Sequence, residues 1–283
     1  MIEHGRRPAK WAATLQTILS AFAGSARFPV DVETLAVNYS KQLYPADPIK
    51  AVRGEPIDGF EGALYPLDKG TGWAIVFNSA VSPGRRRFTI AHEFGHYLMH
   101  RTQAPTGFQC DERSVTFRDG DELEAEADMF AAYLLMPFDD CREQIRPDDR
   151  PTLDQLSVLA ERYGVSLIAA TLRWLEYTHR RSLLVISRDG YVLWSKSSLS
   201  ALRTGRYFRT RGNAPPIPIP SSALTGRSDM ADIGKEGTEH PAGVWFEEDC
   251  IEYTIRSDRY DQSITLLHLP KHALSMFDFK RSG

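Results

Sequence analysis

Apolar side chains recur every three or four residues through much of the first 180 residues, which is the spacing of helices that bury one face. Residues 9–23 show this spacing in Trp11, Leu15 and Leu19, and Gly24 then ends the helix. Further helices of this kind are predicted at about 31–39, 86–100, 121–136, 138–145, 153–163 and 166–179.

Short apolar runs bounded by glycine, proline or polar residues predict strands. In the last third of the chain, LLVIS and YVLWS flank Asp189-Gly190, which is the signal of a β-hairpin. The other predicted strands lie at 59–65, 72–77, 243–246, 251–255 and 263–269. Because helices give way to strands near residue 180, we expect an α+β protein of two domains, at 1–180 and 181–283, the second mainly β or α/β.

Composition and charge narrow the class of protein. The formal net charge of -3 over 283 residues does not indicate a nucleic-acid partner for the chain as a whole. Cys110, Cys141 and Cys250 are far apart and odd in number, which favours a reducing compartment over a disulfide framework. No apolar stretch reaches the ~18 to 20 residues of a membrane span. We therefore expect a cytoplasmic protein without membrane contact.

The strongest chemical signal is the HEFGH sequence at residues 92–96, inside a predicted helix. Side chains four residues apart share one helix face, so His92 and His96 can bind the same Zn²⁺ ion. Glu93 can take a proton from the attacking water and pass it to the leaving amine. The alternative is that both histidines are ordinary surface residues, but the apolar side of this helix favours a buried polar site that needs a partner.

A catalytic zinc site has three protein ligands and one open position. Met99 and Thr102 stand where the HExxHxxGxxH pattern needs Gly and His, which excludes that class. The next helix carries Glu124 and Asp128 four residues apart, so we favour Glu124 as the third ligand and Asp128 as the residue that orients a ligand histidine. Glu126 is the alternative ligand, and a solvated acidic face is the interpretation without a metal.

Zinc suits two imidazoles and a carboxylate best, and Mn²⁺ also fits such a site. His100 lies two turns beyond His92 and is a second candidate neighbour of the metal. We favour instead an exposed histidine at the end of the helix, where a positive charge is stabilised by the helix dipole.

Two blocks of this sequence resemble the ImmA/IrrE family of zinc metallopeptidases: RRRFTIAHEFGHYLMH at 85–100 and EAEADMFAAYLLMP at 124–137. The segments WAIVFNSAVSPG and FPVDVETLA are also similar, so the resemblance covers about residues 10 to 180. It implies a zincin-like peptidase domain with a small sheet beside the HExxH helix. The metal ligands it implies are His92, His96 and Glu124, with Glu93 as the catalytic glutamate, and the family often has Asn in place of Asp128.

The resemblance also implies a substrate, because characterised family members cut Xre-like helix-turn-helix repressors and so relieve repression. We therefore expect a zinc-dependent endopeptidase that cleaves such a repressor in a stress response or mobile element. Long family members carry an extra domain, GAF-like in IrrE, which region 181–283 resembles in its place along the chain. The competing hypothesis is a metal-containing sensor, or a DNA- or partner-binding regulator, without proteolysis. Glu93 speaks against that hypothesis, since a structural metal site needs no base.

Three further segments bear on partners. The helices at about 152–179 resemble a helix-turn-helix, but Arg173 is the only basic residue of the second helix, so we favour packing over DNA reading. A cluster of arginines could bind phosphates or an acidic protein surface. We favour instead the interpretation that these arginines lie on a solvated loop. The members of the cluster are Arg203, Arg206, Arg209 and Arg211. We also expect residues 59–65 to form an exposed sheet edge that binds substrate as an added strand.

Overall fold

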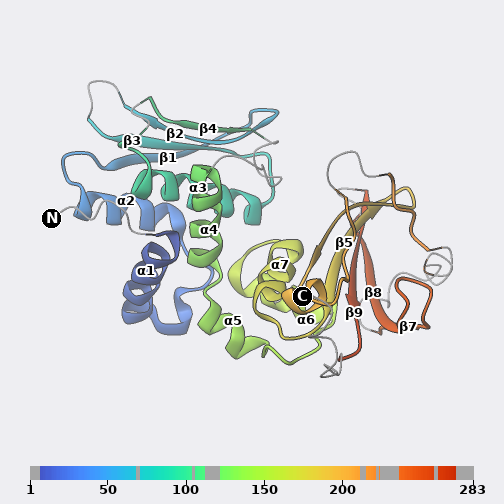
Figure 1. The fold of residues 1–283 in the computed structure, drawn as a ribbon. Helices are drawn as coiled ribbons and strands as arrows, with labels where there is room; N and C mark the ends of the chain where they lie inside the picture. Colours follow the sequence, from blue (N-terminus) through green and yellow to red (C-terminus); the bar gives the residue numbers. More distant parts are fainter. Residues whose placement is uncertain are drawn as a thin grey trace, which may run out of the picture. The chain divides into compact units, whose positions relative to one another are not determined.

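Figure 1 shows the computed structural model of the protein, which describes residues 7–67, 71–103, 106–111, 122–210, 215–220, 223, 236–257 and 261–271. The chain forms two compact units. The first comprises Met1–Cys141 and Leu159–Ser166, and the second comprises Arg142–Val158 and Leu167–Gly283. None of the helices in the described residues combines the length and apolarity needed to cross a lipid bilayer.

The first unit combines a four-stranded sheet with helices, as the predicted α+β fold requires. In the sheet β1 is parallel to β3, and β2 is antiparallel to both β3 and β4, giving the order β1-β3-β2-β4. Helix α3 lies along one face of the sheet against β2 and β3, and α4 packs on α3 and on α1 (Figure 1). The helices are α1 (Pro8–Ala23), η1 (Gly24–Arg27), α2 (Val32–Leu43), α3 (Pro83–Met99) and α4 (Glu122–Leu135), and the strands are β1 (Ile49–Glu55), β2 (Phe60–Pro66), β3 (Trp73–Asn78) and β4 (Phe108–Asp111).

Local sequence fixes where α3 begins and how closely α4 approaches it. The Ser82 side chain accepts a hydrogen bond from the backbone N–H of Arg85, and Pro83 follows as the first helical residue. Phe94 packs edge-on against Phe130 of α4, with ring centroids 5.8 Å apart. A side chain at Gly95 would place its Cβ 2.9 Å from the Phe130 ring, so glycine permits this close contact.

The strands predicted at 59–65 and 72–77 are confirmed as β2 and β3, but two other strands of the first unit were missed. Strand β1 was not predicted because only Ile49 among its residues is fully buried and its second half is exposed. Strand β4 falls within a segment predicted as a loop. The predicted free edge at 59–65 is also wrong, because β2 pairs with β3 on one side and with β4 on the other. Substrate therefore cannot add to β2 without displacing β4.

The second unit is built on a five-stranded antiparallel sheet of order β6-β5-β9-β8-β7. The predicted hairpin is confirmed, with Asp189 and Gly190 both at positive φ between β5 and β6. The prediction of a strand at 243–246 is wrong, since that segment consists of turns and bends with one isolated bridge. The remaining elements are α5 (Phe138–Gln144), α6 (Leu153–Tyr163), α7 (Leu167–Tyr177), β5 (Ser182–Arg188), β6 (Tyr191–Ser197), α8 (Leu199–Leu202), β7 (Thr238–His240), β8 (Cys250–Ser257) and β9 (Gln262–His268).

Helix α7 packs on this second sheet. It contacts β5 and β6, and the Trp174 ring lies 5.6 Å from the His268 ring of β9. Arg173 is only 2% exposed and pairs with Glu176 at 2.7 Å, so the one basic residue of this helix is not available to phosphates. This burial supports a packing role. The two units divide the chain differently from the boundary predicted near residue 180. That boundary stays a prediction. A GAF-like fold for the mainly β part also stays a prediction.

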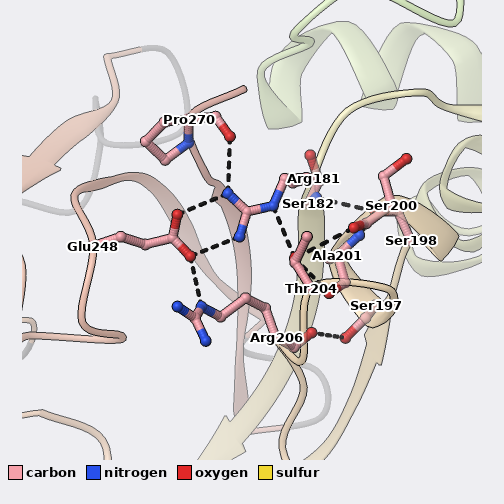
Figure 2. Close-up of polar contacts among 10 residues, drawn as sticks. All are labelled: Arg181, Ser182, Ser197, Ser198, Ser200, Ala201, Thr204, Arg206, Glu248 and Pro270. Atoms are coloured by element: carbon pink, nitrogen blue, oxygen red, sulfur yellow. Dashed lines mark hydrogen bonds and ion pairs between the residues drawn. The ribbon is translucent and has the colours of Figure 1, made fainter. Parts of the chain in front are cut away.

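A partly buried ion-pair network ties the loop before β8 to the residue that precedes β5 and to the segment that follows α8. Figure 2 shows the Arg181 guanidinium between Glu248 and Thr204. Both terminal nitrogens of Arg181 donate to the Glu248 carboxylate at 2.7 Å, and Arg206 donates to it from Nε at 2.6 Å. Hydrogen bonds from Arg181 and Arg206 lower the pKa of Glu248. Arg206 thus belongs to this network rather than to a solvated cluster, and Arg211 lies outside the described residues.

Replacing Glu248 by alanine is expected to destabilise the protein by about 3 to 5 kcal/mol, because it strands the buried Arg181 guanidinium without its carboxylate. The measurement is urea unfolding followed by tryptophan fluorescence. The neighbouring exposed Glu247 is the matched control, and its replacement by alanine should shift stability by no more than about 0.5 kcal/mol. Equal unfolding midpoints for the two variants would show that the network contributes no net stability.

Candidate metal centre

The three predicted ligands lie together in the first unit, where α3 crosses α4. His92 Nε2 and His96 Nε2 are 3.0 Å apart, and each lies 3.2 Å from a carboxylate oxygen of Glu124. Among the described residues this is the one group of three or more His, Cys, Asp or Glu side chains whose ligand atoms lie within 4.8 Å of one another. Two imidazole nitrogens and one carboxylate oxygen form the His₂Glu donor set of catalytic zinc sites, so the residues present fit the ion.

Burial and hydrogen bonding put His96 and Glu124 in the protonation states that bind a metal. Burial lowers the pKa of His96 to about 4, so its imidazole is neutral at physiological pH. Burial opposes ionisation of Glu124, but hydrogen bonds to His92 and His96 prevail and hold its pKa well below the usual range. Neutral imidazoles and an ionised carboxylate are the ligand forms that divalent metals require.

Other polar residues hold the far side of each histidine. Asp128 Oδ1 lies 2.9 Å from His92 Nδ1, which is the contact that the sequence predicted for it. His100 was expected to be exposed, and that prediction is wrong: it is 1% exposed, and its Nδ1 lies 3.0 Å from His96 Nδ1. Glu126 lies outside the ligand group, with Oε2 2.9 Å from His100 Nε2.

The predicted base, Glu93, lies on α3 beside the first ligand. It is fully buried, with 0% of its surface exposed, and it is not a member of the ligand group. The ring of Phe108, at the start of β4, stacks on His96 with centroids 4.2 Å apart. Nothing in the local sequence indicated Phe108, because its place depends on how β4 pairs with β2.

Known proteins share both the sequence and the fold of this region. Residues 51–175 match the family model described as the IrrE N-terminal-like domain of Peptidase M78, and this range includes the ligand group and Glu93. The chain contains a domain of the ImmA/IrrE family. A curated relative, the radiation response metalloprotease IrrE of Deinococcus deserti, is 31% identical over 157 residues, which are 51% of this chain and 52% of that protein. The chain thus spans about half the length of this relative.

A solved structure supports the fold alone. A Mycobacterium tuberculosis transcriptional regulator matches with a TM-score of 0.51 at 12% identity, covering 94% of this chain and 88% of that one. Because the match covers 94% of this chain, it includes residues of both units. The mixed α+β fold is therefore shared with at least one solved structure.

One glycine of this ImmA/IrrE-family domain sets the space around Glu93. Gly62 of β2 faces α3, and a Cβ atom at this position would collide with Thr89 Cγ2 and lie 3.0 Å from Glu93 Oε1. Glu61, the preceding residue, binds Arg85 of α3 through two hydrogen bonds of 2.9 and 2.7 Å, which hold β2 against the helix. Strand and helix cannot simply separate to admit a larger residue.

Gly62→Ala is therefore expected to displace Glu93 and to lower kcat by up to about 10²-fold, the scale on which small misplacements act. Zinc affinity should change little, because none of the three atoms nearest to a Cβ at Gly62 belongs to His92, His96 or Glu124. Adding Thr89→Ser removes the colliding methyl group and should recover part of the lost kcat. Kinetics and zinc titration of the single and double variants check this, and an unchanged kcat in Gly62→Ala would show that the approach of β2 does not position Glu93.

Proposed function

We propose that this chain is a zinc-dependent endopeptidase in which His92, His96 and Glu124 hold the ion and Glu93 is the general base. The convergence of three ligand atoms beside a buried glutamate is the observation that carries this proposal. Mn²⁺ is the alternative ion for the same donor set. When bound, the ion supplies Lewis-acid chemistry that polarises a carbonyl group and acidifies water.

The chain's own residues then have distinct tasks in peptide hydrolysis. Glu93 accepts a proton from the attacking water and delivers it to the amine that leaves. The backbone of β2 approaches the Glu93 side chain at Gly62, where a Cβ atom would lie 3.0 Å from Glu93 Oε1. Asp128 holds the His92 ring from its far nitrogen.

For the substrate, we propose an Xre-like helix-turn-helix repressor in the cytoplasm, whose cleavage relieves repression. The resemblance of the two motif blocks to ImmA/IrrE peptidases supports this choice, and the name of the Deinococcus deserti relative connects that protein with a radiation response. The mainly β part of the chain would then act as a sensor or interaction domain, GAF-like in our prediction.

The test is a cleavage assay with the zinc-loaded chain and the Xre-like repressor encoded nearest to it. We expect one discrete cut, abolished by a chelator and restored by added Zn²⁺, with an unrelated folded protein left intact. If the chain binds zinc and cuts neither this repressor nor other repressors of the class, the substrate proposal fails. The competing hypothesis, a metal-containing regulator without proteolysis, would then be favoured.

A further inference from the structure

The most informative feature outside the ligand group is a chain of contacts behind His96. His100, at the C-terminal end of α3, is buried between His96 and Glu126. Its Nδ1 lies 3.0 Å from His96 Nδ1, and its Nε2 lies 2.9 Å from Glu126 Oε2. The Phe108 ring covers both histidines, with centroids 4.2 Å from His96 and 6.0 Å from His100.

One arrangement of protons suits the contact of His96 with His100 and that of His100 with Glu126, and it leaves His96 able to bind a metal. A ligand nitrogen must offer a lone pair, so His96 Nε2, which faces His92 and Glu124, must be unprotonated. The proton of neutral His96 is then on Nδ1, which donates to His100 Nδ1. His100 in turn has its proton on Nε2, which donates to the Glu126 carboxylate.

The Glu126 carboxylate disfavours the other arrangement, in which the proton of His100 is on Nδ1 and that of His96 is on Nε2. If His100 had its proton on Nδ1, its Nε2 lone pair would face a carboxylate that can only accept hydrogen bonds. A buried acceptor facing an acceptor loses the hydrogen bond without regaining water. The proton of His96 would then move to Nε2, the atom that faces the other two ligands, and metal binding would have to displace it.

We propose that Glu126 and His100 are positioning residues that select the Nδ1-protonated tautomer of His96 and thereby strengthen metal binding at its Nε2. The inference rests on the proposed metal site and deepens it. The two ligand histidines are then held by different means: Asp128 contacts His92 directly, whereas Glu126 acts on His96 through a second imidazole.

Zinc affinity, measured by competition with a chromophoric chelator, is the first readout. His100→Phe keeps a ring of similar size but removes the acceptor, and Glu126→Ala removes the carboxylate; each should raise the zinc Kd about 10- to 100-fold, the usual effect of losing an outer partner of a metal ligand. His100→Gln should stay close to wild type, because its amide can accept from His96 and donate to Glu126. Glu122→Ala, at an exposed position of the same helix, is the matched control.

The second readout is the tautomer of His96, observed by long-range ¹H–¹⁵N NMR in the metal-free protein. In the metal-free protein the Glu124 carboxylate competes for a proton on Nε2 of His96. We therefore expect a larger share of the Nδ1-protonated form in wild type, His100→Gln and Glu122→Ala than in Glu126→Ala. A loss of packing alone would not move this equilibrium. Since the Glu126 side chain is 38% exposed, its removal tests the proposal even if His100→Phe does not fold.

An unchanged tautomer and zinc Kd in Glu126→Ala would overturn the inference. Neither readout depends on proteolysis. A failure of this inference can therefore be distinguished from a failure of the proposed function. A chain that shows the expected changes in zinc affinity but cuts no repressor would support this inference and contradict the peptidase. If the wild-type chain cuts its repressor but the His96 tautomer and zinc Kd are unchanged in Glu126→Ala, the peptidase proposal is supported and this inference is contradicted.

Discussion

Glu93→Gln is expected to lower kcat for peptide cleavage by about 10²- to 10⁴-fold while the zinc Kd stays nearly the same. Glutamine has the size and shape of glutamate but cannot take a proton from water. Because Glu93 is fully buried and lies outside the ligand group, the exchange removes one negative charge near the site and no ligand atom. The measurement pairs cleavage kinetics with zinc titration on the same preparation.

The two halves of that measurement separate the roles open to Glu93. If Glu93 is a general base, Glu93→Gln should lose turnover and keep its zinc affinity. If Glu93 is a metal ligand, turnover and zinc affinity should be lost together. The exposed Glu143 of α5 gives the control, since Glu143→Gln makes the same chemical change far from the ligands in sequence and should leave both quantities unaltered. Wild-type kcat in Glu93→Gln would show that the proton acceptor is another group.

Glu124→Ala is expected to weaken zinc binding by more than about 10²-fold, because loss of an outer partner alone already costs about 10- to 100-fold. The change removes the one oxygen ligand and leaves two imidazoles 3.0 Å apart. Cleavage should be lost in proportion at limiting zinc. The measurement is chelator competition, with Glu122→Ala as the control on the same helix.

The comparison of Glu124→Ala with Glu126→Ala decides between the two carboxylates that the sequence left open as third ligand. The structure predicts the larger loss for Glu124, whose oxygens lie 3.2 Å from both ligand nitrogens, than for Glu126, which contacts His100. A larger loss of zinc affinity in Glu126→Ala would reverse this assignment.

The grouping of the three candidate ligands was predictable in part from short-range helix geometry. Residues four apart on one helix share a face, so the placement of His92 beside His96 followed from spacing alone. The same rule paired Glu124 with Asp128 and correctly placed Asp128 against a ligand histidine. These relationships need only a helix and no knowledge of how distant parts of the chain pack.

What surrounds the centre was not predictable, because it depends on contacts between distant segments. His100 looked like an exposed residue at a helix end, and its burial arises with Phe108, which reaches it from β4. Gly62 had no distinguishing local pattern, since its role depends on the approach of β2 to α3. The same holds for strand order: that β2 lies inside the sheet follows from its pairing with β4.

Apolar content misled one strand prediction in the second unit, at 243–246, for a related reason. Trp245 is buried and its indole N–H donates to the Glu252 carboxylate at 2.7 Å, yet it belongs to a turn rather than a strand. An apolar run shows that a segment is buried, and only pairing partners decide whether it forms a strand. Strand β1 shows the converse, because a mostly exposed segment is paired with β3.

The central claim is that His92, His96 and Glu124 hold one catalytic metal ion beside Glu93. An anomalous difference map at the zinc edge, from crystals of the zinc-loaded chain, tests it most directly. We predict a single strong peak within about 2.0 to 2.2 Å of His92 Nε2, His96 Nε2 and a Glu124 oxygen, with Glu93 close by but outside ligand distance. A peak at other residues, or one ligated by Glu93 or Glu126 in place of Glu124, would contradict the account.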